Sequence, residues 1–150
     1  MIEIPQFIET EKVRELLPQK SKMALIDRVI SHDFASREII CETDIKSDNL
    51  FFDAEAGGVP SFVSFELMAQ SVALLASLGS IASGTKAKSG MVLSVNDFSA
   101  ETAAFKCGQT LKIAVKEDFS SGAVFRYDGN VSADGIVLSQ AKITVIEADF

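Results

Sequence analysis

Two polar residues, Glu66 and Gln70, lie within a run from residue 61 to residue 82 that is rich in Leu, Ala, Met and Phe. Side chains four residues apart share one face of a helix, so these two groups are expected to lie together. A carboxylate that faces a cleft from such a position could take up and release protons. Alternatively, Glu66 is bound by a partner such as Arg28 or by backbone N–H groups, and Gln70 braces a loop. The spacing alone favours this structural alternative, because buried ion pairs also occur without catalysis.

A glycine-rich loop, "GGVP" at residues 57–60, comes directly before this run. Glycine lets the backbone approach a ligand closely, and the first amides of a helix point outward with the positive end of its dipole. The amides of Gly58, Val59 and Ser61 are therefore candidate donors to a carbonyl oxygen that gains negative charge during a reaction. An ordinary capped loop is the alternative meaning of Gly-Gly before a helix.

One long helix and six strands are expected to position these groups. Pro60 suits a first helical turn, and no proline or strand-like alternation interrupts residues 61–82, which predicts one mostly buried helix. A short helix over residues 10–17 is expected to end at Pro18. The strand candidates, one of which follows an Asp-Gly turn, span residues 23–34, 37–45, 89–98, 109–119, 122–131 and 135–148.

These elements predict an α+β fold in which a six-stranded antiparallel sheet curls around the long helix. A helix that is apolar on nearly every side needs such wrapping, since a flat sheet would bury only one stripe. The chain has 150 residues, of which 47% are hydrophobic, and this size suits a single domain over residues 1–150. A membrane span is the alternative by length, but Glu66 and Gln70 would be costly in lipid.

Composition narrows the classes of partner. A formal charge of −7 and scattered basic residues argue against nucleic-acid binding.

The sequence is typical of a cytoplasmic protein. The N-terminal residues lack the basic and apolar regions of a secretion signal. Cys41 and Cys107 lie far apart in the sequence and are expected to be reduced, buried thiols. No phosphate-binding loop, dinucleotide fingerprint or metal-ligand cluster is present, so no cofactor or metal is predicted.

Several short motifs occur in a fixed register along the chain. They are Leu-Leu-Pro at residues 16–18, Asp27-Arg28, Phe51-Phe52, Pro60 six residues before Glu66, and Met68-Ala69-Gln70. Together they resemble the FabA/FabZ class of hydroxyacyl-thioester dehydratases, which are members of the hotdog superfamily. The later strands are similar to a subgroup of dehydratases from aryl-polyene and related lipid pathways. The resemblance covers nearly the whole chain and implies a hotdog fold, with a six-stranded sheet wrapped around one long helix.

The resemblance also implies a chemistry, the loss of water from a 3-hydroxyacyl thioester carried on acyl carrier protein or coenzyme A. Sites of this family lie at a dimer interface, in a tunnel for the acyl chain. Glu66 stands at the position of the family's catalytic acid, and the Ser61 amide stands where the carbonyl oxygen is held. Gly58, Val59 and Gln70 complete the expected substrate-binding residues. A homodimer, or a heterodimer with a related hotdog subunit, is the expected assembly.

The chain departs from the family at the histidine that normally works with the acidic residue. Gln19, which follows Leu-Leu-Pro, stands where the related subgroup commonly has this histidine, and it is the second candidate catalytic residue. The single histidine, His32, is predicted to be solvent-exposed at a hairpin turn rather than a relocated base. Lys86 and Lys88 follow the long helix and are interpreted as a solvated turn rather than a docking site for acyl carrier protein.

Three functional hypotheses follow. In the first, the protein is a dehydratase in which Glu66 acts alone, or with Gln19 and a water molecule. In the second, it is a hotdog thioesterase in which the helix carboxylate activates water and no histidine is needed. In the third, it binds acyl thioesters without catalysis, or forms a heterodimer whose other subunit supplies the histidine.

Overall fold

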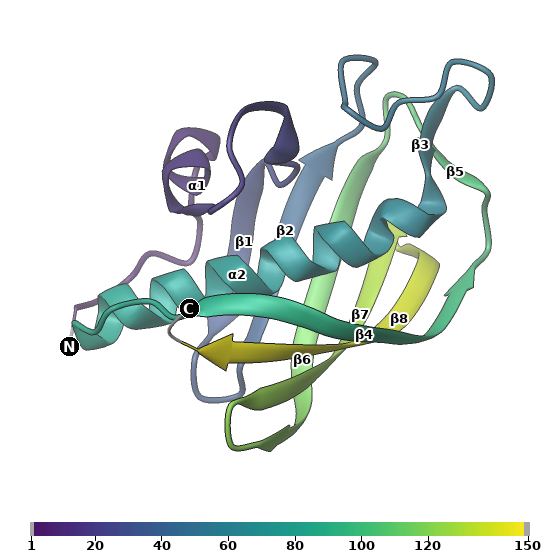
Figure 1. Ribbon diagram of the computed structural model, residues 1–150. Coiled ribbons are helices and arrows are strands. Elements are labelled where there is room, and N and C mark those ends of the chain that lie inside the picture. Colours follow the sequence, from purple (N-terminus) through teal and green to yellow (C-terminus); the bar gives the residue numbers. More distant parts are fainter. Residues whose placement is uncertain (1, 149–150) are drawn as a thin grey trace.

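A 20-residue helix, α2 (Ser64–Ser83), runs through the centre of the computed structural model, which describes residues 2–148 (Figure 1). A single 3-10 turn, η2 (Ser61–Val63), leads into it, so the predicted long helix is confirmed with a tighter first turn. The helix ends at Gly84, whose φ of 69° is the left-handed conformation that favours glycine at a helix C-terminus.

The predicted six-stranded antiparallel sheet is confirmed within residues 2–148. Its spatial order is β1-β2-β6-β7-β8-β4, so β4 forms one edge. The Asp-Gly turn predicted before the last strand joins β7 to β8, and both of its residues have positive φ. The strands are β1 (Arg28–Asp33), β2 (Glu38–Asp44), β4 (Ser89–Ala100), β6 (Thr110–Ser121), β7 (Val124–Ala133) and β8 (Ile136–Ala148).

Two short strands, β3 (Gly58–Pro60) and β5 (Ala104–Lys106), form a separate antiparallel ribbon that the sequence did not predict. Strands of three residues carry too little alternation to be recognised. The ribbon holds the glycine-rich loop next to the start of α2. At the N-terminal side, the predicted short helix is present as α1 (Thr10–Leu16), and a 3-10 turn, η1 (Ser21–Met23), follows it.

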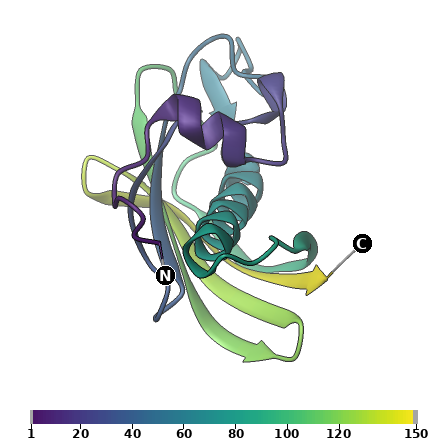
Figure 2. The ribbon, with the colours of Figure 1, turned by 90° about the vertical axis from the view of Figure 1, so that its left-hand side faces the viewer.

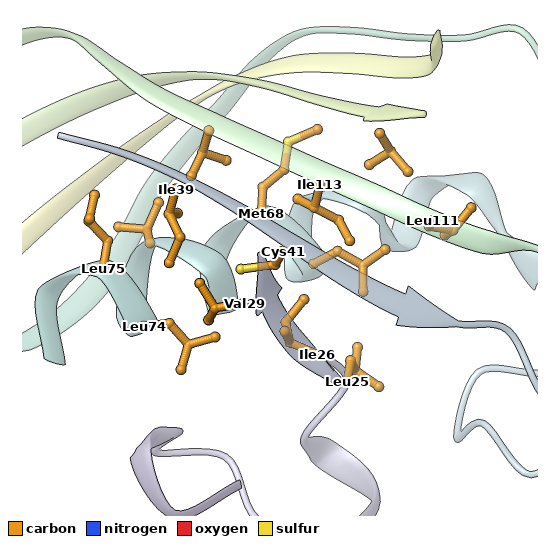
Figure 3. Close-up of a cluster of buried hydrophobic side chains, with 14 of the residues drawn as sticks. Leu25, Ile26, Val29, Ile39, Cys41, Met68, Leu74, Leu75, Leu111 and Ile113 are labelled. Atoms are coloured by element: carbon orange, nitrogen blue, oxygen red, sulfur yellow. The ribbon is translucent and has the colours of Figure 1, made fainter. Parts of the chain in front are cut away.

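The sheet curls around α2, as the view from the left-hand side of Figure 1 shows (Figure 2). Alternate residues of β2 and β6 face the helix, which produces the buried–exposed alternation of these strands. Side chains from α2, β1, β2 and β6 meet in one apolar cluster (Figure 3). On β7, Gly129 lets Met68 pack against the backbone, because a Cβ atom there would lie 2.6 Å from the Met68 sulfur.

Helix α2 is long and apolar enough to cross a membrane, but its apolar side chains pack against the sheet of the same chain. Leu67, Met68, Leu74 and Leu78 are all at most 2% exposed. This burial is typical of the central helix of a folded domain, since a membrane span would present such side chains to lipid.

The expectation of two buried thiols is wrong for one cysteine. Cys41 is buried on β2, whereas Cys107 is exposed after β5. The apolar residues before Cys107 belong to β5, and the chain then turns through Gly108, which has a φ of 95°. Its apolar neighbours in the sequence therefore do not imply that Cys107 is buried.

Candidate active site

Glu66 lies in the first turn of α2 and is half-buried at one end of a groove of about 540 Å³. Toward the C-terminal end of α2, the groove is lined by the small residues Ala69, Ala73 and Ala76. Small side chains at this spacing leave space beside the helix where larger ones would fill it. The helix therefore presents one carboxylate at the head of a largely apolar channel.

The opposite wall of the groove comes from β4 and β8, including Met91, Val92 and Val145. These residues were not predicted to belong to the site. The alanine spacing on the helix could have indicated the groove from the sequence. The β4 wall could not have been found in this way, because it meets the helix only through the curvature of the sheet.

Gln19 lines the same groove as Glu66, so the structure brings the two predicted catalytic residues to one cavity. The side-chain oxygen of Gln19 is buried and has no hydrogen-bond partner among residues 2–148. A buried amide oxygen without a partner is unfavourable, and a donor that enters the groove would satisfy it. The position of Gln19 therefore suits contact with a hydroxyl group or a water molecule.

Gln70 is fully buried and lies outside the residues that line the groove. Its side-chain oxygen accepts a hydrogen bond from the Leu25 amide over 2.8 Å. Its side-chain nitrogen donates to the Met23 carbonyl over 2.8 Å and to Oε1 of Glu66 over 3.0 Å. Gln70 thus joins Glu66 to the segment that follows α1.

The glycine-rich loop lies close to Glu66 in sequence, but the amides of Gly58 and Ser61 already have partners. The Gly58 amide donates to the Asp53 carbonyl over 3.2 Å, and the Ser61 amide donates to the Ala103 carbonyl over 2.9 Å. Val59 is 1% exposed in the β3–β5 ribbon. None of these residues lines the groove, and their role in holding a carbonyl oxygen stays a prediction.

Gly58 has a clear packing function. A Cβ atom at this position would lie 1.8 Å from the Phe105 carbonyl oxygen, so only glycine fits against β5. The glycine that suggested approach to a ligand is therefore required by approach to another strand of the same chain.

The predicted exposure of His32 is wrong. His32 lies on β1 and is only 8% exposed. Its ring stacks on Phe34 with 4.8 Å between the ring centroids, and its Nε2 atom lies 2.8 Å from the Pro5 carbonyl oxygen. The N-terminal segment covers the strand end here, a long-range contact that the local sequence does not reveal. His32 does not line the groove, so the lining contains no imidazole within residues 2–148.

Arg28, the alternative partner considered for Glu66, binds Glu42 and Asp44 instead. Asp27 accepts a hydrogen bond from Arg14 over 2.6 Å and another from the Asp44 amide over 2.7 Å. Asp27 and Arg28 thus make structural contacts with different partners. Glu66 is left to face the groove.

A second cavity of about 350 Å³ adjoins the groove and shares three lining residues with it, Ala76, Lys88 and Glu147. Glu147 is held by Arg37 at 3.2 Å, and Arg37 also donates to the Tyr127 hydroxyl over 2.7 Å. Burial raises the pKa of Tyr127 despite this bond, so the phenol stays protonated. Because Ala76 borders both cavities, the second cavity lies next to the groove along α2. Lys86 and Lys88, both exposed, border this second cavity.

The arrangement can perform acid–base chemistry on a ligand bound along the helix. The carboxylate of Glu66 borders an apolar channel, whose other carboxylate, Glu147, is paired with Arg37. The Gln19 amide, with its unpaired oxygen, lines the same cavity. Within residues 2–148, no cluster of three or more His, Cys, Asp and Glu side chains could hold a metal ion.

The curved sheet wrapped around a single long helix defines a hotdog fold. The family model described as "ApeP-like: ApeP dehydratase" matches residues 11–150. The chain belongs to this ApeP-like dehydratase family.

Relatives agree with this assignment. A 3-hydroxyacyl-[acyl-carrier-protein] dehydratase FabZ from Anaeromyxobacter dehalogenans (strain 2CP-C) is 25% identical over 140 residues, which cover 91% of this chain and 88% of that protein. The resemblance to FabZ-like dehydratases, and the dehydratase-like function that it implied, are thereby confirmed.

Solved structures share the fold. The dehydratase heterocomplex ApeI:P from Xenorhabdus doucetiae includes a chain with a TM-score of 0.83 and 20% identity, with 91% of each chain covered. A hypothetical thioesterase with coenzyme A from Streptococcus pneumoniae TIGR4 gives a TM-score of 0.61 and 15% identity, covering 81% of this chain and 84% of that one. The predicted hotdog fold is confirmed.

Proposed function

We propose that this protein dehydrates 3-hydroxyacyl thioesters and that Glu66 transfers the protons. The observation that carries the proposal is the half-buried carboxylate of Glu66 at the head of the groove. Glu66 removes a proton from the carbon next to the thioester carbonyl, and the electron pair of that C–H bond forms the new double bond. The C3–O bond breaks, and the departing oxygen takes a proton to leave as water.

Gln19 would contact the hydroxyl group that departs. Its unpaired buried oxygen can accept a hydrogen bond from the substrate hydroxyl or from a water molecule beside Glu66. An amide cannot supply a proton at neutral pH. Glu66 would therefore return the proton that it removed, or a second subunit would supply an acid.

We further propose that the working unit is a dimer formed through β4. This strand forms one edge of the sheet, and each of Met91, Leu93, Val95 and Phe98 is at least 38% exposed. Exposed apolar edge strands attract another strand, and β4 also forms one wall of the groove. A second subunit seated there would close the site.

The partner that we favour is a related hotdog subunit that carries the family histidine. The described lining residues of this groove include the carboxylates of Glu66 and Glu147 and the amide of Gln19, but no imidazole. One structural relative is a dehydratase heterocomplex, and one sequence relative acts on acyl-carrier-protein substrates. A substrate on acyl carrier protein is accordingly our proposal for this chain.

A thioesterase is the second candidate function. A carboxylate without a histidine could activate water against the thioester carbonyl, and solved hotdog neighbours include a hypothetical thioesterase with coenzyme A. Such a reaction would release a free thiol from a saturated acyl thioester, whereas dehydration requires the 3-hydroxyl group.

Both functions can be tested in one experiment. The purified protein, alone and with a histidine-bearing hotdog subunit, is incubated with 3-hydroxyacyl and saturated acyl thioesters, and enoyl product and free thiol are measured separately. We expect enoyl product, and a loss of about 10²- to 10⁴-fold in Glu66→Gln. Glu11→Gln, which changes an exposed carboxylate on α1, is the control and should retain activity. Thiol release without enoyl product would reject dehydration, and equal activity in Glu66→Gln would reject the role of Glu66.

A further inference from the structure

The orientation of the Gln70 side chain is determined by its surroundings. The Leu25 amide can only donate, so the Gln70 atom that it contacts at 2.8 Å must be the oxygen. The two hydrogens of the side-chain nitrogen therefore point to the Met23 carbonyl and to Oε1 of Glu66. All of these groups are hydrogen-bonded, so Gln70 has no freedom to turn toward a ligand.

This geometry distinguishes the two oxygens of Glu66. Oε1 accepts the hydrogen bond from Gln70 over 3.0 Å, so this oxygen is directed toward the interior of the protein. Oε2 is left to exchange a proton with a molecule in the groove. A free glutamate side chain has several rotamers, and a bond to a buried, fixed donor removes much of this freedom before a substrate arrives.

Gln70 also connects the two sides of the groove. Met23 and Leu25 lie in the segment that follows Gln19, and that segment is joined to α2 through the same amide that holds Glu66. A change in Gln70 would therefore alter the placement of the carboxylate relative to Gln19.

We propose that Gln70 is a positioning residue that acts through Glu66 rather than a substrate-binding residue. It holds the carboxylate so that Oε2 faces the groove. This proposal rests on the proposed function, because it assigns to Gln70 an effect on the proton transfer by Glu66.

The first test compares Gln70→Met with a control on the same helix. Gln70→Met retains an unbranched side chain of similar length and removes both hydrogen bonds from the nitrogen. Ser71→Ala removes a buried hydrogen bond to the Leu67 carbonyl and leaves Glu66 untouched. For Gln70→Met we expect kcat to fall about 10- to 100-fold, the scale of a displacement near 1 Å, with KM little changed. For Ser71→Ala we expect kcat to stay within about twofold of the wild type.

A double-mutant cycle separates positioning from general stability. In the Glu66→Gln background, Gln70→Met should change the residual rate less than twofold, because the positioned carboxylate is already gone. An equal loss of kcat in both backgrounds would overturn the proposal, as would an unchanged kcat in Gln70→Met. If Gln70→Met does not fold, the Gln70 side-chain amide signals of the wild type and of Glu66→Ala test the contact without a change at position 70.

A measurement without turnover keeps this test separate from the proposed function. The side-chain amide signals of Gln70 in an NMR spectrum should move in Glu66→Ala, which removes their acceptor, and should stay in place in the control Glu11→Ala. Signals that do not move in Glu66→Ala would overturn the contact on which the proposal depends. Signals that move in this way in a protein without dehydratase activity would reject the proposed function and, with it, the positioning of a catalytic group.

Discussion

Arg28 binds Asp44 through two parallel hydrogen bonds, Nη1 to Oδ2 over 3.0 Å and Nη2 to Oδ1 over 2.8 Å. This fork joins β1 to the end of β2, and Thr110 adds a third bond to the same carboxylate from β6. The hydrogen bonds from Arg28 lower the pKa of Asp44 from its ordinary value of 3.8 to about 2.

The first prediction concerns stability in acid. Because the pKa of Asp44 is lowered by folding, its contribution to the free energy of unfolding is complete above pH 3.8 and is lost as the pH falls to about 2. The wild type should therefore lose stability over this interval more steeply than Asp44→Asn, and should be more stable than that variant at pH 7. Urea unfolding at several pH values measures this, with the exposed Asp48→Asn as the control. Parallel curves for the wild type and Asp44→Asn would contradict the prediction.

The second prediction concerns acyl-chain length. Ala76 lines both the groove and the adjoining cavity, so Ala76→Phe should block the passage between them. We expect kcat/KM to fall about tenfold or more for long acyl thioesters and to change little for short ones, since bound methylenes each contribute to specificity. Ile81→Phe, at a partly exposed position on the same helix that lines neither cavity, is the control. An equal loss at every chain length would show that the acyl chain does not follow this path.

The third prediction compares two glycines with opposite surroundings. Gly58→Ala should destabilise the protein by about 1–3 kcal/mol or more, because its Cβ atom would overlap the Phe105 carbonyl oxygen. Gly79→Ala should stabilise it by about 0.5–1 kcal/mol, since the added Cβ atom would lie 3.7 Å from Phe34 in ordinary contact and alanine favours a helix. Urea unfolding measures both effects, and a stable Gly58→Ala protein would count against the β3–β5 pairing.

The fourth prediction concerns thiol reactivity. Burial raises the pKa of Cys41 to about 12, whereas Cys107 is exposed. Because the thiolate is the reactive form, a thiol reagent at pH 8 should label one cysteine in the folded protein and both after unfolding. Cys107→Ser should abolish labelling of the folded protein, and rapid labelling that persists in this variant would be inconsistent with a buried Cys41.

Much of the fold could be predicted from local patterns. The run of Leu, Ala and Met between two loops predicted α2, and its apolar faces predicted a sheet wrapped around it. Apolar residues at every second position, such as Leu111, Ile113 and Val115, predicted the strands, because the helix covers one face of each strand. These features depend on residues close together in the chain.

Features that local patterns did not reveal depend on contacts between distant segments. The wrong prediction for His32 arose because the N-terminal segment crosses this residue and buries it. The hydrogen bond from the Ser61 amide to Ala103 is likewise a contact between distant segments. No local pattern contains this information. Glu66 and Gln70 were recognised from their spacing, but only the structure shows that Gln70 is sealed away from the groove while Glu66 borders it.

The exposed edge of β4 should affect the solubility of the protein when it is synthesised in a cell. When the chain is made without the partner subunit proposed above, this apolar strand offers unpaired backbone groups to any other extended chain, which is a route to aggregation. If that partner binds at β4, balanced synthesis of the two chains would cover the edge soon after folding. The strand that would form the dimer interface therefore also makes an unpartnered subunit prone to aggregation. The yield of soluble protein should depend on the ratio in which the two chains are co-expressed.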